Sequence, residues 1–135
     1  MSALDAIAVN TEIASGNVEP LLHEIRHALK RLANGDEGAV IDLQRLPLAP
    51  GEEERIEAAL GKGEVRAEVN ALGLTQVLET SYPGVWLITH RNAEDSIVAR
   101  FIEVTDMPEL LKSQRADIEH GIQKLETELK NWESV

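Results

Sequence analysis

The chain contains no cysteine, and aromatic residues make up only 3% of its 135 residues. The lack of cysteine excludes disulfides, thiolate zinc sites, thiolate-bound iron–sulfur clusters and cysteine nucleophiles in this chain. The scarcity of aromatic rings and the net charge of −11 argue against nucleic-acid binding, which needs a basic surface and, for base contacts, stacking rings. An acidic balance of this kind keeps a protein soluble and suits a protein that binds other proteins.

Long apolar runs are also missing. No segment reaches membrane-spanning length, and the first residues, MSALDAIAVNTEIASGN, lack the positive start and unbroken apolar stretch of a signal peptide. We therefore expect a cytoplasmic protein without membrane insertion. The length suits one domain. We divide the chain into a loosely structured segment, 1–16, whose weak alternation permits an edge strand, and a single α+β domain, 17–135.

A β-hairpin is the strongest predicted element. Residues 85–91 and 96–104 are rich in β-branched and aromatic residues, and the intervening Asn92-Ala93-Glu94-Asp95 has turn chemistry. Around this central hairpin, 85–104, we expect a two-layer mixed sheet of about five strands packed with three helices. The further strands are predicted at 39–43, 64–71 and 76–81, and the helices at 20–33, 50–60 and 108–133.

The hairpin register follows if Arg91 pairs with Ser96 across the turn. Trp86 then lies opposite Phe101, on a face that we assign to the core. The other face is nearly as apolar and needs a cover, which we expect from helices of the same chain or, alternatively, from a partner. The residues on that other face are Val85, Leu87, Val98, Ile102 and Val104.

The last predicted helix, 108–133, has its own apolar pattern. Asp106 and Glu109 have capping-box spacing at its start. Its apolar residues recur at alternating intervals of four and three, which is typical of a coiled-coil seam. We weigh packing on its own domain against self-association as a homodimer, and a break near residues 113–114 would shorten the helix. The seam consists of Ile118, Ile122, Leu125, Leu129 and Trp132.

The segment His23-Glu24-Ile25-Arg26-His27 matches the H-E-x-x-H pattern of zinc hydrolases, in which two histidines hold zinc and the glutamate deprotonates its water. His23 and His27 are thus candidate metal ligands. A catalytic zinc also needs a third protein ligand, and Ala33 stands where the metzincin pattern has its third histidine. We therefore predict no catalytic residue, metal or cofactor and no enzyme, and we keep a zinc hydrolase as the alternative.

The first helix also has a basic face within an acidic protein. His23, Arg26, His27 and Lys30 lie opposite its apolar stripe. A local reversal of charge suits the docking of an acidic partner. We predict a partner-binding site formed by these four residues and by nearby loops, including Arg91 and Asn92.

Several short blocks occur in a characteristic order from Ser15 onward. They are Ser15-Gly16-Asn17, Leu22-His23-Glu24-Ile25, Val40-Ile41-Asp42-Leu43 with Leu46-Pro47-Leu48, Gly61-Lys62-Gly63-Glu64-Val65, Ala71-Leu72-Gly73, Glu79-Thr80, Pro83-Gly84-Val85-Trp86, Phe101-Ile102-Glu103-Val104-Thr105, Pro108-Glu109 and Ser113-Gln114. In these blocks the chain resembles the C-terminal conserved region of the HupH/HyaF family of hydrogenase expression/formation proteins.

The resemblance implies an accessory or chaperone protein in [NiFe] hydrogenase maturation. Its implied partners are the immature iron–sulfur small subunit precursor and other maturation factors. The resemblance brings no catalytic residue with it. Because the chain has no cysteine to hold a cluster, a chaperone role fits better than cluster delivery. A generic dimerising adaptor remains a further alternative.

Overall fold

The computed structural model describes residues 17–133, so the predicted loose segment and its edge strand lie outside the described residues. The elements, in chain order, are α2 (Val18–Ala33), β1 (Ala39–Asp42), η1 (Leu43–Arg45), α3 (Glu52–Leu60), β2 (Arg66–Asn70), β3 (Leu74–Glu79), β4 (Val85–Arg91), β5 (Ile97–Val104), η2 (Glu109–Leu111) and α4 (Arg115–Glu133). The α+β class is confirmed.

The sheet has five strands in the order β1-β5-β4-β3-β2. Every neighbouring pair is antiparallel, so the expectation of a mixed sheet is wrong. The strand–helix–strand order of β1, α3 and β2 resembles a parallel crossover in sequence, but these two strands occupy opposite edges of the sheet. Instead β1 pairs with β5, with Ile41 opposite Ile102.

The β4–β5 hairpin forms as predicted, but its register differs by two residues. Trp86 lies opposite Glu103, and Ile88 lies opposite Phe101. The reason is the turn, where the Asn92 side chain accepts hydrogen bonds from the amides of Glu94 and Ser96, both at 3.0 Å. This wider turn adds an irregularity between His90 and Arg91. The shift of two residues leaves Trp86, Ile88 and Phe101 on one face, as predicted. At the irregularity, however, Ile97 pairs with Arg91 and not with His90, and Val98 has no partner in the register and is exposed.

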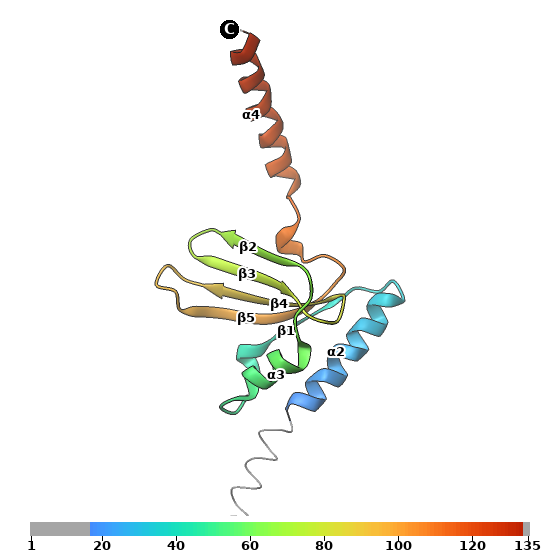
Figure 1. Ribbon diagram of the computed structural model, residues 1–135. Helices are drawn as coiled ribbons and strands as arrows, with labels where there is room; N and C mark the ends of the chain where they lie inside the picture. Colours follow the sequence, from blue (N-terminus) through green and yellow to red (C-terminus); the bar gives the residue numbers. More distant parts are fainter. Residues whose placement is uncertain (1–16, 134–135) are drawn as a thin grey trace, which may run out of the picture.

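Both faces of the hairpin are covered by the chain itself (Figure 1). Helices α2 and α3 cover one face, and the short turn η2 lies on the other. The larger core lies under the helices, on the face for which the sequence required a cover. It contains Leu21, Ile25, Ala28, Ile41, Leu43, Ile56, Leu60, Val85, Leu87, Ile102 and Val104.

The Trp86 face, predicted to be the core, holds the smaller apolar cluster. Val77, Trp86 and Ile88 are buried there, and Leu111 from η2 packs against them. The indole N–H of Trp86 donates a hydrogen bond of 3.1 Å to the carbonyl of Thr105. The cluster thereby fixes the chain as it leaves β5.

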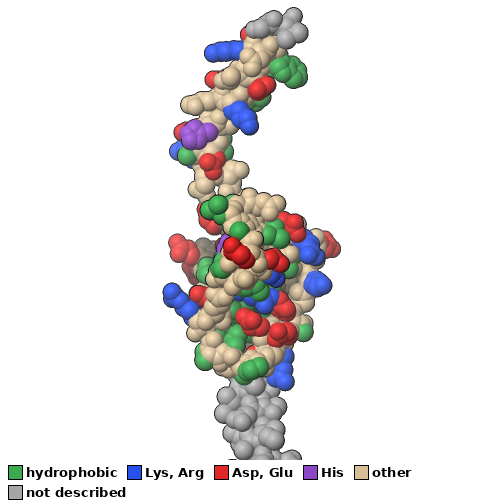
Figure 2. Space-filling model, turned by 90° about the vertical axis from the view of Figure 1, so that its left-hand side faces the viewer, with side chains coloured by type: hydrophobic (Ala, Val, Ile, Leu, Met, Phe, Trp, Pro, Cys, Tyr) green, Lys and Arg blue, Asp and Glu red, His purple; other side chains and the backbone are tan. Residues whose placement is uncertain are grey.

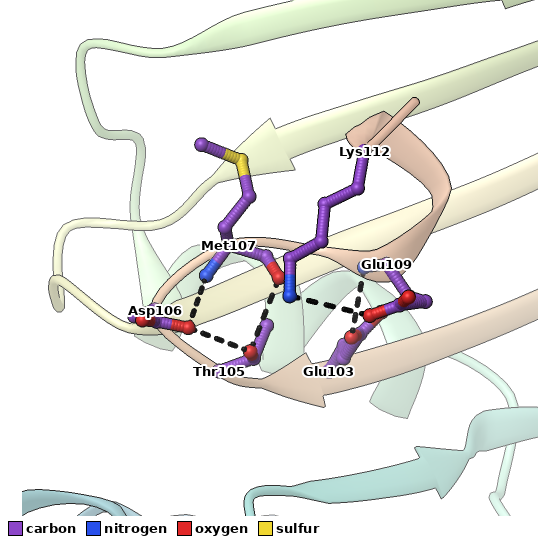
Figure 3. A network of polar contacts seen from close by, with 6 residues as sticks. All are labelled: Glu103, Thr105, Asp106, Met107, Glu109 and Lys112. Carbon is purple, nitrogen blue, oxygen red and sulfur yellow. Dashed lines mark hydrogen bonds and ion pairs between the residues drawn. The ribbon is translucent and has the colours of Figure 1, made fainter. Parts of the chain in front are cut away.

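The segment between β5 and α4 is an ordered connection and not the start of a long helix (Figure 3). The Asp106 carboxylate accepts a hydrogen bond from the amide of Met107 at 2.8 Å, whereas the amide of Glu109 faces Glu103 at 3.4 Å. The predicted capping box is therefore absent at this position. The break near residues 113–114 is present, and α4 begins only at Arg115.

Helix α4 does not pack on the domain, so only two of the three expected helices cover the sheet. All of its residues are exposed, and it stands away from the sheet (Figures 1 and 2). Its predicted apolar seam therefore faces no other described part of the chain.

Candidate functional site

The H-E-x-x-H segment does not assemble a metal site in the described part of the chain. His23 and His27 are both exposed on α2, and Nε2 of His23 lies 3.7 Å from Oε1 of Glu19 on the same helix. Among residues 17–133, no three His, Cys, Asp or Glu side chains come together as ligands. A catalytic zinc needs three protein ligands, so the two histidines alone do not supply a catalytic centre.

The basic face of α2 is exposed as predicted, because the opposite stripe is committed to the core. Leu21, Ile25 and Ala28 are buried under the sheet. Arg26 and Lys30 point to solvent together with the two histidines. This arrangement leaves positive charge on one helix of a chain whose net charge is −11.

An apolar hollow adjoins these cations. It has a volume of about 230 Å³ and is lined by Leu22, Ile25, Arg26, Leu29, Leu60 and Tyr82. Tyr82 is 49% exposed, so its ring is available at the mouth of the hollow. We use the name α2 surface for this hollow and its basic rim, formed by Leu22, His23, Arg26, His27, Leu29, Lys30 and Tyr82.

A tight turn between β3 and β4 positions Tyr82. The hydroxyl of buried Thr80 donates to the carbonyl of Val85 at 2.9 Å and accepts from the amide of Tyr82 at 3.2 Å. Gly84, at φ +93°, completes the turn, and a Cβ there would lie 3.2 Å from Cδ2 of Leu29. The turn is thus pressed against α2, and a side chain at this glycine would push them apart.

Sequence reasoning did not select Tyr82 as a site residue. The available signal was that the only tyrosine of the chain directly precedes Pro83-Gly84, a turn that exposes its neighbours. Contact between this turn and α2 depends on the packing of the whole core, so it was not visible in the sequence.

The structure does not bring Arg91 and Asn92 to the α2 surface. Arg91 ends β4 and Asn92 follows it, whereas Leu29 and Leu32 of α2 lie against Gly84, just before β4 begins. The seven residues of β4 span roughly 23 Å, so the two groups lie at opposite ends of the strand (Figure 1). Both residues form hydrogen bonds within their own turn. Arg91 Nη1 donates to the carbonyl of Asp95 at 3.0 Å, and the Asn92 side chain accepts from the amides of Glu94 and Ser96.

A buried carboxylate holds α2 in place beside α3. Glu52, with no exposed surface, accepts hydrogen bonds from the Asn17 side chain at 2.9 Å and from the amide of Ala49 at 2.7 Å. Desolvation by itself raises the pKa of this carboxyl. The hydrogen bonds from Ala49 and Asn17 and the charge of Arg55 outweigh that effect, so the pKa lies below its ordinary value. Glu52 is therefore ionised, and its hydrogen bond to Asn17 links the two helices.

These features define a small α+β domain with an antiparallel sheet and an exposed basic and apolar surface on one helix. Within residues 17–133, no helix combines the length and apolar character that crossing a membrane requires. Comparison with known proteins identifies the family of this domain.

Residues 16–132 match the family described as HupH hydrogenase expression protein, C-terminal conserved region. The chain belongs to this family. It is 44% identical to a solved structure, the hydrogenase expression protein HupH from Thiobacillus denitrificans, with a TM-score of 0.83. That similarity covers 87% of this chain and 98% of the solved chain.

Curated relatives are also named hydrogenase expression/formation proteins. The chain is 31% identical over 101 residues to the hydrogenase expression/formation protein HupH of Rhizobium leguminosarum bv. viciae, and the matched region covers 75% of this chain. It is 27% identical over 114 residues to HoxQ of Azotobacter vinelandii, which covers 81% of this chain. The chain spans only 36% and 39% of the length of these two relatives.

Proposed function

We propose that this chain takes part in [NiFe] hydrogenase maturation as a non-enzymatic accessory protein that binds the immature iron–sulfur small subunit. The match of residues 16–132 to a family of hydrogenase expression proteins carries this proposal. The absence of cysteine adds to it, because a chain without thiolates has no means of holding an iron–sulfur cluster in the usual way and is better suited to hold the apoprotein.

The α2 surface is the binding site that we propose. Protein interfaces combine a desolvated apolar centre with a polar rim, and aromatic and arginine side chains contribute strongly to them. Tyr82 and the apolar hollow supply the centre, and Arg26 and Lys30 supply a charged rim. The matching segment of the small subunit would carry an apolar anchor beside acidic residues, which the basic rim would steer into place.

Co-purification of the small-subunit precursor tests both parts of the proposal. We expect wild-type protein to capture the precursor and the double variant R26E/K30E to capture it more slowly and with a weaker dependence on salt. The matched control is K62E/R66E, which reverses one lysine and one arginine, also four residues apart, in the connection after α3 and at the start of β2. Both pairs are exposed, so neither variant disturbs the core.

The outcomes separate the function from the site. Failure of the wild-type protein to bind the precursor defeats the proposed function. Equal binding by wild type and R26E/K30E, or an equal loss in K62E/R66E, retains the function but removes the α2 surface as its site. Tyr82→Ala tests the apolar centre, and we expect faster dissociation with little change in the association rate.

Metal analysis tests the non-enzymatic part. We expect protein purified without a histidine tag to contain far less than one zinc per chain. Zinc near one per chain that is lost in His23→Ala and in His27→Ala, together with peptidase activity lost in the same variants, contradicts the proposal in favour of a zinc hydrolase.

A further inference from the structure

Helix α4 exposes a continuous apolar seam. Ile118, Ile122, Leu125, Leu129 and Trp132 are 52%, 52%, 62%, 51% and 76% exposed, although residues of these types are normally buried. Their alternating intervals of four and three place them at the a and d positions of a heptad repeat. Side chains at these positions pack between helices in coiled coils, so the seam has the pattern of a helix-packing surface.

The positions that flank the seam carry charge of one sign. With Ile122 and Leu129 at a, the flanking e and g positions are held by Glu119, Gly121, Glu126, Glu128 and Glu133. The two lysines of the helix, Lys124 and Lys130, fall at the outer c and b positions. Every charged side chain that borders the seam from Ile118 onward is therefore acidic.

A second copy of α4 is a poor match for this seam. Parallel pairing sets the g position of one helix against the following e position of the other, which places Glu128 against Glu133. Antiparallel pairing sets e against e and g against g, which again offers only glutamate and Gly121. Neither arrangement contains a single attractive flanking pair, and like charges at these positions oppose association.

Neither the other helices within residues 17–133 nor the composition of the first 16 residues offers a complement to this seam. The first 16 residues include two acidic side chains and no lysine or arginine. Helix α2 is basic, but its own apolar stripe is buried in the core. The missing partner must therefore combine apolar a and d residues with basic flanks.

We propose that α4 docks an amphipathic helix of a different protein, one whose e and g positions carry lysine or arginine. The five seam residues would supply the buried contact, and the four flanking glutamates would select the basic partner over a second copy of this chain. This site is separate from the α2 surface and does not depend on the proposed role of that surface.

Two synthetic helical peptides test the proposal. Both contain three heptads with isoleucine at a and leucine at d and lack tryptophan; one has lysine at every e and g position, and the other has glutamate there. We expect the full chain to bind the lysine peptide at least about tenfold more tightly than the glutamate peptide at low salt, with the ratio falling as salt is added. The emission of Trp132 reports binding, and Trp132→Phe gives the background from buried Trp86.

Variants of the seam and its flanks make the result specific. Leu125→Ala with Leu129→Ala should abolish binding of the lysine peptide, and replacing Glu119, Glu126, Glu128 and Glu133 by lysine should reverse the preference between the peptides. The same changes should leave the unfolding midpoint of the domain unchanged, because α4 is exposed throughout.

Three results would overturn the proposal. The first is equal or absent binding of the two peptides. The second is sedimentation of the free chain as a dimer that Leu125→Lys converts to a monomer, which would make a second copy the occupant. The third is a free monomer in which Trp132 already emits as a buried residue, which would show that the chain itself covers the seam.

Discussion

The side-chain amide of Asn17 donates a hydrogen bond of 2.9 Å to the buried carboxylate of Glu52 and so joins the start of α2 to the start of α3. The ionised form of Glu52 is favoured in the folded protein, because its pKa lies below its ordinary value. A carboxyl of this kind stabilises the fold fully above its unfolded pKa and loses that contribution as pH falls through its folded pKa.

Glu52→Gln should therefore lower the urea midpoint at pH 7. The difference in midpoint between the variant and wild type should be smaller at acid pH, where wild-type Glu52 becomes protonated. Urea titrations of both proteins at pH 7 and at about pH 3 measure this difference. The neighbouring Glu54→Gln is the control, because Glu54 is exposed. A gap between wild type and Glu52→Gln that stays constant down to pH 3 would show that ionisation of Glu52 contributes nothing.

The second face of the sheet should contribute to stability as a true core. Val77→Ala should lower the free energy of unfolding by roughly 2 kcal/mol, because two buried methyl groups are lost and a cavity remains. Val40→Ala is the matched substitution on the same face, at a side chain that is 65% exposed. It should change the free energy of unfolding by less than about 0.5 kcal/mol. Urea unfolding measures both, and equal effects would mean that η2 does not cover this face.

The turn that holds Tyr82 depends on a single hydroxyl. Thr80→Val keeps the shape of the side chain but removes its hydrogen bonds to Val85 and Tyr82, so we expect a loss of about 1–2 kcal/mol. Thr127→Val removes a comparable hydroxyl contact on exposed α4 and should cost less than about 0.5 kcal/mol. Thermal unfolding followed by circular dichroism separates the two, and an unchanged Thr80→Val protein would contradict this role.

Helix α4 should be dispensable for folding. Deleting residues 115–135 should change the free energy of unfolding of the domain by less than about 0.5 kcal/mol, because no residue of α4 is buried. Leu111→Ala, just before the deleted segment, should cost about 1–2 kcal/mol through its contact with Val77, Trp86 and Ile88. A deletion that destabilises more than Leu111→Ala would show that α4 packs on the domain.

Local signals predicted the elements well. The apolar stripe at helical spacing gave α2 to within two residues, and the β-branched run at 85–91 gave β4 with the limits it has in the structure. These signals depend on neighbours within one turn or one strand, which the sequence contains in full.

The arrangement of the elements depended on contacts between distant residues, and here the predictions failed. The hairpin register changed because the Asn92 side chain accepts two amides, which a turn residue does in only some geometries. The last helix began later than predicted because Leu111 is held in the Trp86 cluster. For the site, charge and helical period predicted His23, Arg26, His27 and Lys30 as exposed, whereas the placement of Tyr82 and Arg91 required the fold.

The pairing of β1 with β5 has a consequence for folding during synthesis. Ile41 finds its partner Ile102 only 61 residues later in the chain, and the core beneath α2 and α3 is completed by that same strand. During synthesis from the amino end, both helices emerge long before their apolar stripes have a surface to cover. The nascent domain therefore remains open until β5 is made and then closes in one late step, as expected of folds built on distant strand pairs.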